Sequence, residues 1–328
     1  MEIVVSGIRP TGNLHLGNYF GAIRNFLTLQ EEYNCFFFIA DWHSLTTHPK
    51  PGDVTANVRK ILAEYLACGI DPEKAAIYVQ SDVKEVLELY LYLNMNAYLG
   101  ELERVTSFKE KARTQPDNVN AGLLTYPTLM AADVLMHKAV KVPVGKDQEQ
   151  NMEMIRKFAR RFNTIYGADY FPEPASYSFA GAAVKVPGLD GSGKMGKSEG
   201  NAIYLADDPD VIRKKVMKAV TDSGPTAPDS PKPEAIENLF TLLKMVSPAE
   251  TYHYFNDQYN CCAIRYGDLK KQLAEDIIAF TAPIREKILG IVSDTAYMDR
   301  VAEMGAEKAR ESAARTVREV REIIGFRG

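Results

Sequence analysis

Two glycine-containing segments carry residues suited to binding phosphates. The first reads Gly7-Ile-Arg-Pro-Thr-Gly-Asn-Leu-His15-Leu-Gly17-Asn18, and it follows an expected strand and leads into an expected helix. Open α/β sheets bind ligands at the carboxyl ends of their strands, where glycines let phosphate oxygens approach a helix N-terminus. The same glycines are also ordinary turn residues. His15 is correspondingly a candidate phosphate donor or a helix-capping histidine.

The second segment, Gly191-Ser-Gly-Lys194-Met-Gly-Lys197-Ser198, matches the P-loop pattern of a glycine, four residues and Gly-Lys-Ser. A P-loop needs a strand before it and a helix that begins at its Lys-Ser pair. Here Pro187-Gly188 ends the strand early, and the extended Ile203-Tyr-Leu205 follows. The context therefore argues against a P-loop kinase.

Asp133 is the most informative single residue because it lies in the apolar run from Met130 to Met136. A carboxylate left unpaired in apolar surroundings is costly, so something must satisfy it. A backbone amide or a basic side chain can do so, and so can a donor on a bound ligand. His43, after Asp41-Trp42, is either a packed core histidine or part of the same site.

The pattern around these residues predicts an α/β protein. Short apolar runs at 2–5, 35–40 and 75–80 predict strands, and 18–33 and 58–67 carry apolar residues at helical spacing. Strands that alternate with helices are typical of a doubly wound parallel sheet.

We expect two domains. Residues 1–205 form the α/β domain, with a helical insertion at about 105–175 that the strand-like 142–144 interrupts, and a short extended piece at 182–186. The glycine density from 188 to 200 predicts a mobile loop. Residues 206–328 contain a Pro-rich stretch at 224–233 and otherwise form a helical domain, with its last helix at about 300–324.

Composition excludes several classes of protein. The 328 residues are 46% hydrophobic with a net charge of -4, so no global positive field points to a nucleic acid. The longest apolar run, 35–40, is far too short to span a bilayer, and the N-terminus lacks the features of a signal peptide. We therefore expect a cytoplasmic protein without a membrane span. Its 4 cysteines contain no C-x-x-C pair, so we expect no structural metal.

The two phosphate-binding candidates together resemble the class I aminoacyl-tRNA synthetases. His15-Leu-Gly-Asn18 is similar to the HIGH motif of that family, and Lys194-Met-Gly-Lys-Ser198 is similar to its KMSKS motif. Further stretches narrow the resemblance to the bacterial tryptophanyl-tRNA synthetases and extend it over essentially the whole chain: 100–111, 121–127, Leu129-Met-Ala-Ala-Asp133, Pro143-Val-Gly-Lys-Asp-Gln148 and 305–309.

This resemblance implies a Rossmann-like catalytic domain that activates L-tryptophan with ATP and transfers it to tRNA(Trp). Magnesium would be held chiefly by the triphosphate, because no carboxylate cluster with ligand spacing is visible. The resemblance also implies a homodimer whose interface is the helical insertion. The helical C-terminal domain, including Arg265, Lys270, Lys271 and the basic end of the last helix, is the candidate surface for the tRNA anticodon.

The resemblance assigns three groups of site residues. Lys111, Lys194 and Lys197 are catalytic cations that neutralise the charge on departing pyrophosphate. The ATP-binding residues are Arg9, Pro10, Thr11, His15, Gly17, Asn18, Gly145, Lys146, Asp147, Val186, Lys194, Met195, Gly196, Lys197 and Ser198. The tryptophan-binding residues are Gly7, His43, Tyr126, Met130, Asp133, Val142, Val144 and Gln148, with Asp133 accepting the indole N–H.

The chain departs from the family pattern at a few positions. Gly196 stands where the motif usually has serine, Lys146 where glutamate is usual, and Asn18 where the general motif ends in histidine. Cys261-Cys262 is not followed by the further cysteines of an iron–sulfur cluster, so we expect none. Two alternatives stay open: a tyrosyl-tRNA synthetase, and a noncatalytic paralogue that binds tryptophan.

Overall fold

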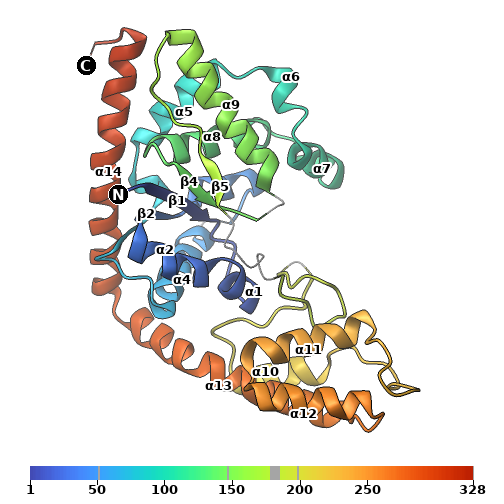
Figure 1. Ribbon diagram of the computed structural model, residues 1–328. Coiled ribbons are helices and arrows are strands. Elements are labelled where there is room, and N and C mark those ends of the chain that lie inside the picture. The colour runs from blue at the N-terminus through green and yellow to red at the C-terminus, as the bar shows by residue number, and fades with distance from the viewer. Residues whose placement is uncertain (51, 146–147, 178–184, 198, 328) are drawn as a thin grey trace. The chain divides into compact units, whose positions relative to one another are not determined.

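A five-stranded parallel sheet organises the first part of the computed structural model, which describes residues 1–50, 52–145, 148–177, 185–197 and 199–327 (Figure 1). The strands are β1 (Ile3–Ile8), β2 (Asn34–Ile39), β3 (Ala75–Val79), β4 (Lys141–Pro143) and β5 (Ala175–Tyr177). Their order is β3-β2-β1-β4-β5, with every neighbouring pair parallel. The prediction of a doubly wound α/β fold is confirmed.

Helices connect and cover the strands. The bounds are α1 (Leu16–Asn18), the π-helical turn η1 (Tyr19–Ile23), α2 (Arg24–Glu32), α3 (Asp41–Ser44), η2 (Leu45–Thr47), α4 (Asp53–Cys68), η3 (Gln80–Asp82), α5 (Glu85–Met95), α6 (Leu99–Leu102), α7 (Thr106–Thr114), η4 (Pro116–Asn118), α8 (Ala121–Leu135), α9 (Glu149–Tyr166), α10 (Pro209–Met217), α11 (Glu234–Val246), α12 (Ala249–Asn260), α13 (Tyr266–Ser293) and α14 (Thr295–Ile324). No described helix is long and apolar enough to cross a membrane.

The central strands form where the sequence is continuously apolar. β2 is buried along its whole length after Asn34, as expected for a strand covered on both faces. It pairs with β1 in a register that sets Gly7 against Phe38. The strand order reverses between β1 and β4, and ligands of such sheets bind beyond the carboxyl ends of the strands at this switch point.

The two outer strands on the far side of β1 are shorter. β4 lies inside the expected insertion, but it pairs with β1 and belongs to the main sheet. β5 was not predicted because Ala-Ser-Tyr has neither an alternating nor a continuous apolar pattern. Of the expected extended piece at 182–186, residues 182–184 lie outside the described residues, and the other two are in no strand.

The chain folds into two compact units. The sheet unit contains the described residues of 1–12, 26–182 and 294–328, and the helical unit contains those of 13–25 and 183–293. This division differs from the expected boundary at 205 in three respects, the first of which is that the described residues of 183–205 belong to the helical unit. Residues 13–25 group with the helices, because Tyr19 and Phe20 pack against Phe280 with ring centroids 5.3 and 5.2 Å apart. The last helix, α14, groups with the sheet.

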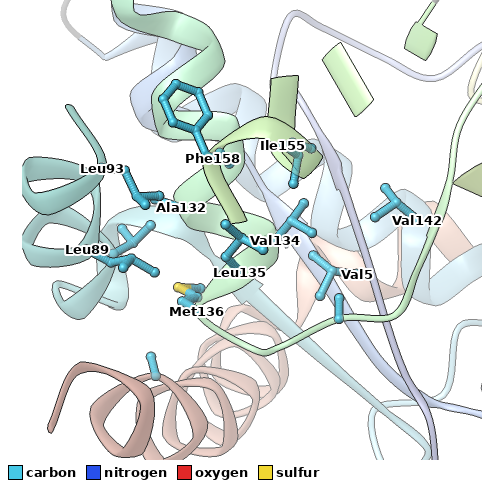
Figure 2. Close-up of a cluster of buried hydrophobic side chains, with 14 of the residues drawn as sticks. Val5, Leu89, Leu93, Ala132, Val134, Leu135, Met136, Val142, Ile155 and Phe158 are labelled. Atoms are coloured by element: carbon cyan, nitrogen blue, oxygen red, sulfur yellow. The ribbon is translucent and has the colours of Figure 1, made fainter. Parts of the chain in front are cut away.

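The core of the sheet unit surrounds α8. Figure 2 shows Val134 and Leu135 from this helix, and Met136 directly after it, among apolar side chains of the neighbouring elements. The cluster includes Leu89 and Leu93 from α5, Ile155 and Phe158 from α9, Val5 from β1 and Val142 from β4. Because α8 is buried from Ala131 to Met136, close packing fixes the position of any side chain in that stretch.

The helical unit has a core of its own, made of Leu239, Phe240 and Leu243 from α11 with Leu269 and Leu273 from α13. Lys270 also lies in this interior. Its Nζ donates to the Ala219 carbonyl at 2.7 Å and to Thr221 at 3.1 Å, so it supplies hydrogen bonds to the segment just after α10. The expectation that Lys270 contributes to a tRNA-binding surface is therefore wrong, whereas Arg265 and Lys271 are exposed.

The helix α14 lies directly on β3. A Cβ atom added at Gly305 would stand 1.9 Å from the backbone oxygen of Ile77, so only glycine fits this crossing. Farther along the helix, Ser312 hydrogen-bonds His137 at 3.0 Å and Glu319 accepts from Lys138 at 2.6 Å. These contacts explain why α14 belongs to the sheet unit.

We expect Gly305→Ala to lower the free energy of unfolding by about 1–3 kcal/mol, because helix and strand must separate to admit the methyl group. Gly290→Ala is the matched control, since Gly290 lies inside α13 with open space around its Cβ position. There the helix propensity of alanine should stabilise by up to about 1 kcal/mol. Melting temperatures measure both effects, and equal values for the two variants would contradict the close crossing.

Candidate active site

Asp133 lies in the last turn of α8, and its side chain is 1% exposed. Its Oδ2 accepts from Nε2 of His43 at 2.7 Å, and its Oδ1 accepts from Nε2 of Gln80 at 2.7 Å. Burial raises the pKa of the Asp133 carboxyl, and the hydrogen bond from His43 acts in the opposite direction. The Asp133 carboxylate therefore has hydrogen-bond partners within the fold itself, as one of the two explanations for its burial requires. Each carboxylate oxygen still has capacity for a second donor.

His43 belongs to the short helical segment that follows β2. It lies in α3 and is buried, and its ring meets Tyr126 edge-on with the centroids 4.8 Å apart. Nε2 of this ring bonds the Asp133 carboxylate, and Nδ1 is buried without a hydrogen-bond partner among the described residues. His43, Asp133 and Tyr126, all predicted site residues, are thus brought together.

Gln80 and Asp41 belong to the same group but were missed. Gln80 begins η3 directly after β3, and Asp41 begins α3 directly after β2. Oδ1 of Asp41 accepts the backbone N–H groups of Trp42 and Ser81, both at 3.0 Å, so one carboxylate joins the two turns. Their position at the carboxyl ends of adjacent parallel strands was the available signal.

The remaining predicted tryptophan-binding residues lie in β1, in α8 and in the segment from β4 to the start of α9. Gly7 is exposed near the end of β1, and a Cβ atom there would stand 2.3 Å from the Phe38 ring. Val142 is buried in β4, and Val144 follows the strand partly buried. Met130 packs against the core from α8, and Gln148 accepts from Asn151 at 2.8 Å.

Two cations of the sheet unit influence each other. Burial lowers the pKa of Lys111, and the charge of Arg9 lowers it further. Nζ of Lys111 also lies 5.2 Å from the centre of the Tyr126 ring. Neither cation has an ion pair with a carboxylate among the described residues. Positive charges arranged in this way favour an anion such as a phosphate.

The HIGH-like segment begins α1 in the helical unit. Oδ1 of Asn18 accepts the backbone N–H of His15 at 3.1 Å, so asparagine at the last position of the motif caps the turn. A Cβ atom at Gly17 would stand 2.8 Å from the His15 ring. Burial, and then the charge of Lys197, lower the pKa of His15 to about 4. His15 is therefore neutral at physiological pH.

The KMSKS-like segment is organised by Asn201, another residue that was missed. Oδ1 of Asn201 accepts the backbone N–H of Gly196 at 2.9 Å, while Nδ2 donates to Asp190, to Ser192 and to the Lys194 carbonyl at 2.9–3.1 Å. Glycine at 188 is required because a Cβ atom there would stand 2.1 Å from this amide.

The two motifs are joined by backbone hydrogen bonds within the helical unit. Leu16 donates to the Ile203 carbonyl at 3.0 Å, and Leu205 donates to the Leu14 carbonyl at 2.9 Å. Met195 is buried and donates to the Val186 carbonyl at 2.7 Å. Lys194 is exposed, whereas Lys197 is partly buried.

Some predictions fall outside the residues that the structure describes. These are Lys146, Asp147 and Ser198, so the departure at 146 has no structural account. Of the others, Pro10 is buried, Thr11 is exposed, and Gly145 accepts the backbone N–H of Gln148. In the described ranges no group of three or more His, Cys, Asp or Glu side chains could hold a metal ion.

The chain resembles known proteins along its full length. Residues 2–282 match the model of the tRNA synthetases class I (W and Y). A tryptophan–tRNA ligase of Porphyromonas gingivalis is 78% identical over 100% of both chains, and one of Rickettsia felis is 41% identical over 99% of both. The solved tryptophanyl-tRNA synthetase of Campylobacter jejuni, complexed with ADP and tryptophan, is 34% identical, with a TM-score of 0.89 over 99% of this chain and 100% of its own.

The chain belongs to the class I tRNA synthetases for tryptophan and tyrosine. Within that family, its relatives of higher identity are bacterial tryptophan enzymes, as the sequence motifs indicated.

Gly196 stands where the KMSKS motif usually has serine. A Cβ atom at Gly196 would stand 1.9 Å from Oε2 of Glu199, so the Glu199 carboxylate occupies the space of the missing side chain. The contact involves the far end of a flexible side chain, which can move aside. Glycine at this position is therefore compatible with the family's loop.

We expect Asn201→Ala to raise the KM for ATP about tenfold in the amino-acid-dependent exchange of pyrophosphate into ATP, equivalent to about 1.4 kcal/mol. The hydrogen bonds that hold 190–196 are lost, while the tryptophan pocket keeps its contacts. Asn256→Ala is the matched control, since the side chain of this asparagine of α12 accepts from Nζ of Lys232 at 2.8 Å and does not belong to the Asn201 network. An unchanged KM for ATP in Asn201→Ala would show that the network does not shape the nucleotide site.

Proposed function

We propose that this protein is a tryptophan–tRNA ligase. It activates L-tryptophan with ATP to tryptophanyl-adenylate and pyrophosphate, and then transfers tryptophan to the 3′ end of tRNA(Trp). The observation that carries this proposal is the 78% identity with a tryptophan–tRNA ligase over the whole of both chains. The place of its action is then the cytoplasm.

The pocket around Asp133 supports tryptophan as the amino acid. Its carboxylate can accept the indole N–H in addition to the hydrogen bonds from His43 and Gln80. Phenylalanine would leave this buried acceptor without its third donor, and sites of that kind reject such an analogue by about four to five orders of magnitude. Gly7, Tyr126, Met130, Val142, Val144 and Gln148 complete the pocket.

The cations support adenylation. Attack of the tryptophan carboxylate on the α-phosphorus releases pyrophosphate, whose growing negative charge needs neutralising. Lys194 and Lys197 of the KMSKS-like segment, together with Lys111, are the cations that we propose for this role, and Arg9 would contact ATP. His15, Gly17, Asn18, Val186, Met195 and Gly196 would contact ATP, together with Pro10, Thr11, Gly145, Lys146, Asp147 and Ser198. Mg²⁺ would be held by the triphosphate and lower its charge.

The proposed adenylation is tested by pyrophosphate exchange into ATP with tryptophan, tyrosine, phenylalanine or no amino acid. We expect exchange with tryptophan alone. Exchange with tyrosine would move the assignment to a tyrosyl-tRNA synthetase. Tryptophan binding without exchange would identify a noncatalytic paralogue.

An exposed apolar face supports a homodimer. Leu87, Leu91 and Met95 follow one another at four-residue spacing along α5 and are 45, 47 and 76% exposed, and Tyr98 and Leu99 continue the face into α6. Side chains of this size in contiguous exposure mark an interaction surface. The face lies just before the expected interface at 105–175, so we place the dimer contact on α5 and α6. Arg265 and Lys271 are the exposed cations we propose for the tRNA.

We expect Leu91→Glu to shift the protein from dimer to monomer in sedimentation velocity at micromolar concentration, because two copies of the face would then bury a carboxylate. Leu289→Glu is the matched control, since Leu289 is 55% exposed on α13, which belongs to the helical unit and not to the face on α5 and α6. A monomeric wild-type protein would contradict the proposed dimer, and an unaffected Leu91→Glu dimer would place its interface elsewhere.

A further inference from the structure

Gln80 is more buried than its polarity would suggest. Its side chain is 1% exposed at the carboxyl end of β3, and its amide nitrogen lies 2.7 Å from Oδ1 of Asp133. Glutamine is seldom fully buried unless its polar atoms are used. The one side-chain hydrogen bond that Gln80 makes to a described residue goes to the carboxylate of the proposed pocket, so strand pairing does not explain why this side chain is buried.

The direction of the Gln80 amide follows from its partner. A carboxylate only accepts, so the NH₂ group must face Asp133 and Oε1 must point away from it. Oε1 of Gln80 is buried and has no hydrogen-bond partner among the described residues, and the same is true of Nδ1 of His43. Asp133 thus has one donor on each oxygen, and each donor has a second polar atom in the same buried group that bonds none of the described residues.

The two donors are fixed relative to each other. His43 lies in α3 and Gln80 in η3, and Oδ1 of Asp41 binds a backbone N–H in each of these turns at 3.0 Å. The donors therefore clamp the carboxylate from two strand ends, while the packing of α8 fixes its Cα atom. A neutral amide does this without cancelling the negative charge of Asp133, as lysine or arginine would.

We propose that Gln80 is a positioning residue that orients the Asp133 carboxylate toward the indole N–H and so sets the preference for tryptophan. This inference rests on the proposed function, because it takes Asp133 as the indole acceptor. Gln80 acts through Asp133 and makes no contact of its own with the reacting atoms.

The test compares tryptophan with benzothienylalanine, an analogue with sulfur in place of the indole N–H, in the pyrophosphate exchange assay. The measured quantity is the ratio of kcat/KM for the two amino acids. Gln80→Met keeps the length of the side chain and removes the donor. We expect it to lower the ratio about tenfold, through a higher KM for tryptophan with kcat nearly unchanged and little effect on the analogue.

The matched control is Gln30→Met. Gln30 is also buried in the sheet unit, where its amide donates to the Gly69 carbonyl and accepts the Asp71 N–H, remote from this group. Its loss should change stability but not the ratio. If circular dichroism shows that Gln80→Met does not fold, Gln80→Glu replaces it as the test. Glutamate keeps the shape of the side chain but places a second carboxyl against Asp133, so the ratio of kcat/KM should fall further.

The outcomes separate this inference from the proposed function. Wild-type preference for tryptophan that disappears in Asp133→Asn establishes Asp133 as the indole acceptor. With that preference present, equal losses for both amino acids in the Gln80 variants, or an unchanged ratio, would overturn the positioning role. Tryptophan-dependent exchange without a wild-type preference over benzothienylalanine would overturn it as well, and would leave adenylation intact.

Discussion

The buried carboxylate of Asp133 is the interaction on which the rest of the sheet unit depends. Removing it from water raises its pKa, and only donors placed within hydrogen-bond distance reduce the cost of keeping it charged. The donors are His43 and Gln80, each 2.7 Å away. One follows β2 and the other follows β3, so the pairing of these two strands is what brings the donors to one point.

Several structural features serve to keep that point fixed. The helix α8 is buried on its core side from Ala131 to Met136, and Asp41 links the two turns that carry the donors. Behind β3, α14 crosses at Gly305, and Arg310 on the same helix donates to the Asp82 carbonyl at the end of η3 at 3.2 Å. The terminal helix therefore supports the strand and turn that position Gln80.

Sequence patterns predicted the parts of this arrangement that depend on local chemistry. The continuous apolar runs of β1, β2 and β3, the helical spacing of α4 and the cost of burying Asp133 were all visible in the residues themselves. The family resemblance added the grouping of His43, Tyr126 and Asp133, which a single chain cannot reveal by spacing because they lie on separate elements. Hydrogen bonds and ring contacts do bring these three together.

What could not be predicted depends on contacts between segments distant in sequence. Gln80 reads as the last residue of a strand, and only the approach of α8 turns it into a partner of Asp133. The sequence predicts Lys270 as a surface cation, but its Nζ donates to the backbone carbonyl of Ala219, just after α10. The place of α14 with the sheet follows from the close crossing at Gly305 and from the contacts of Ser312 and Glu319, which no helical periodicity indicates.

The glycine at position 196 shows how the second motif tolerates a departure from the family pattern. A serine there would contribute one hydroxyl to a loop whose conformation is already set by the Asn201 side chain, through hydrogen bonds to Gly196, Asp190, Ser192 and the Lys194 carbonyl. Because this network uses the backbone N–H at 196 and not its side chain, glycine leaves the network whole. The loop geometry therefore rests on Asn201, and Lys194 and Lys197 keep their places on either side of Met195 and Gly196.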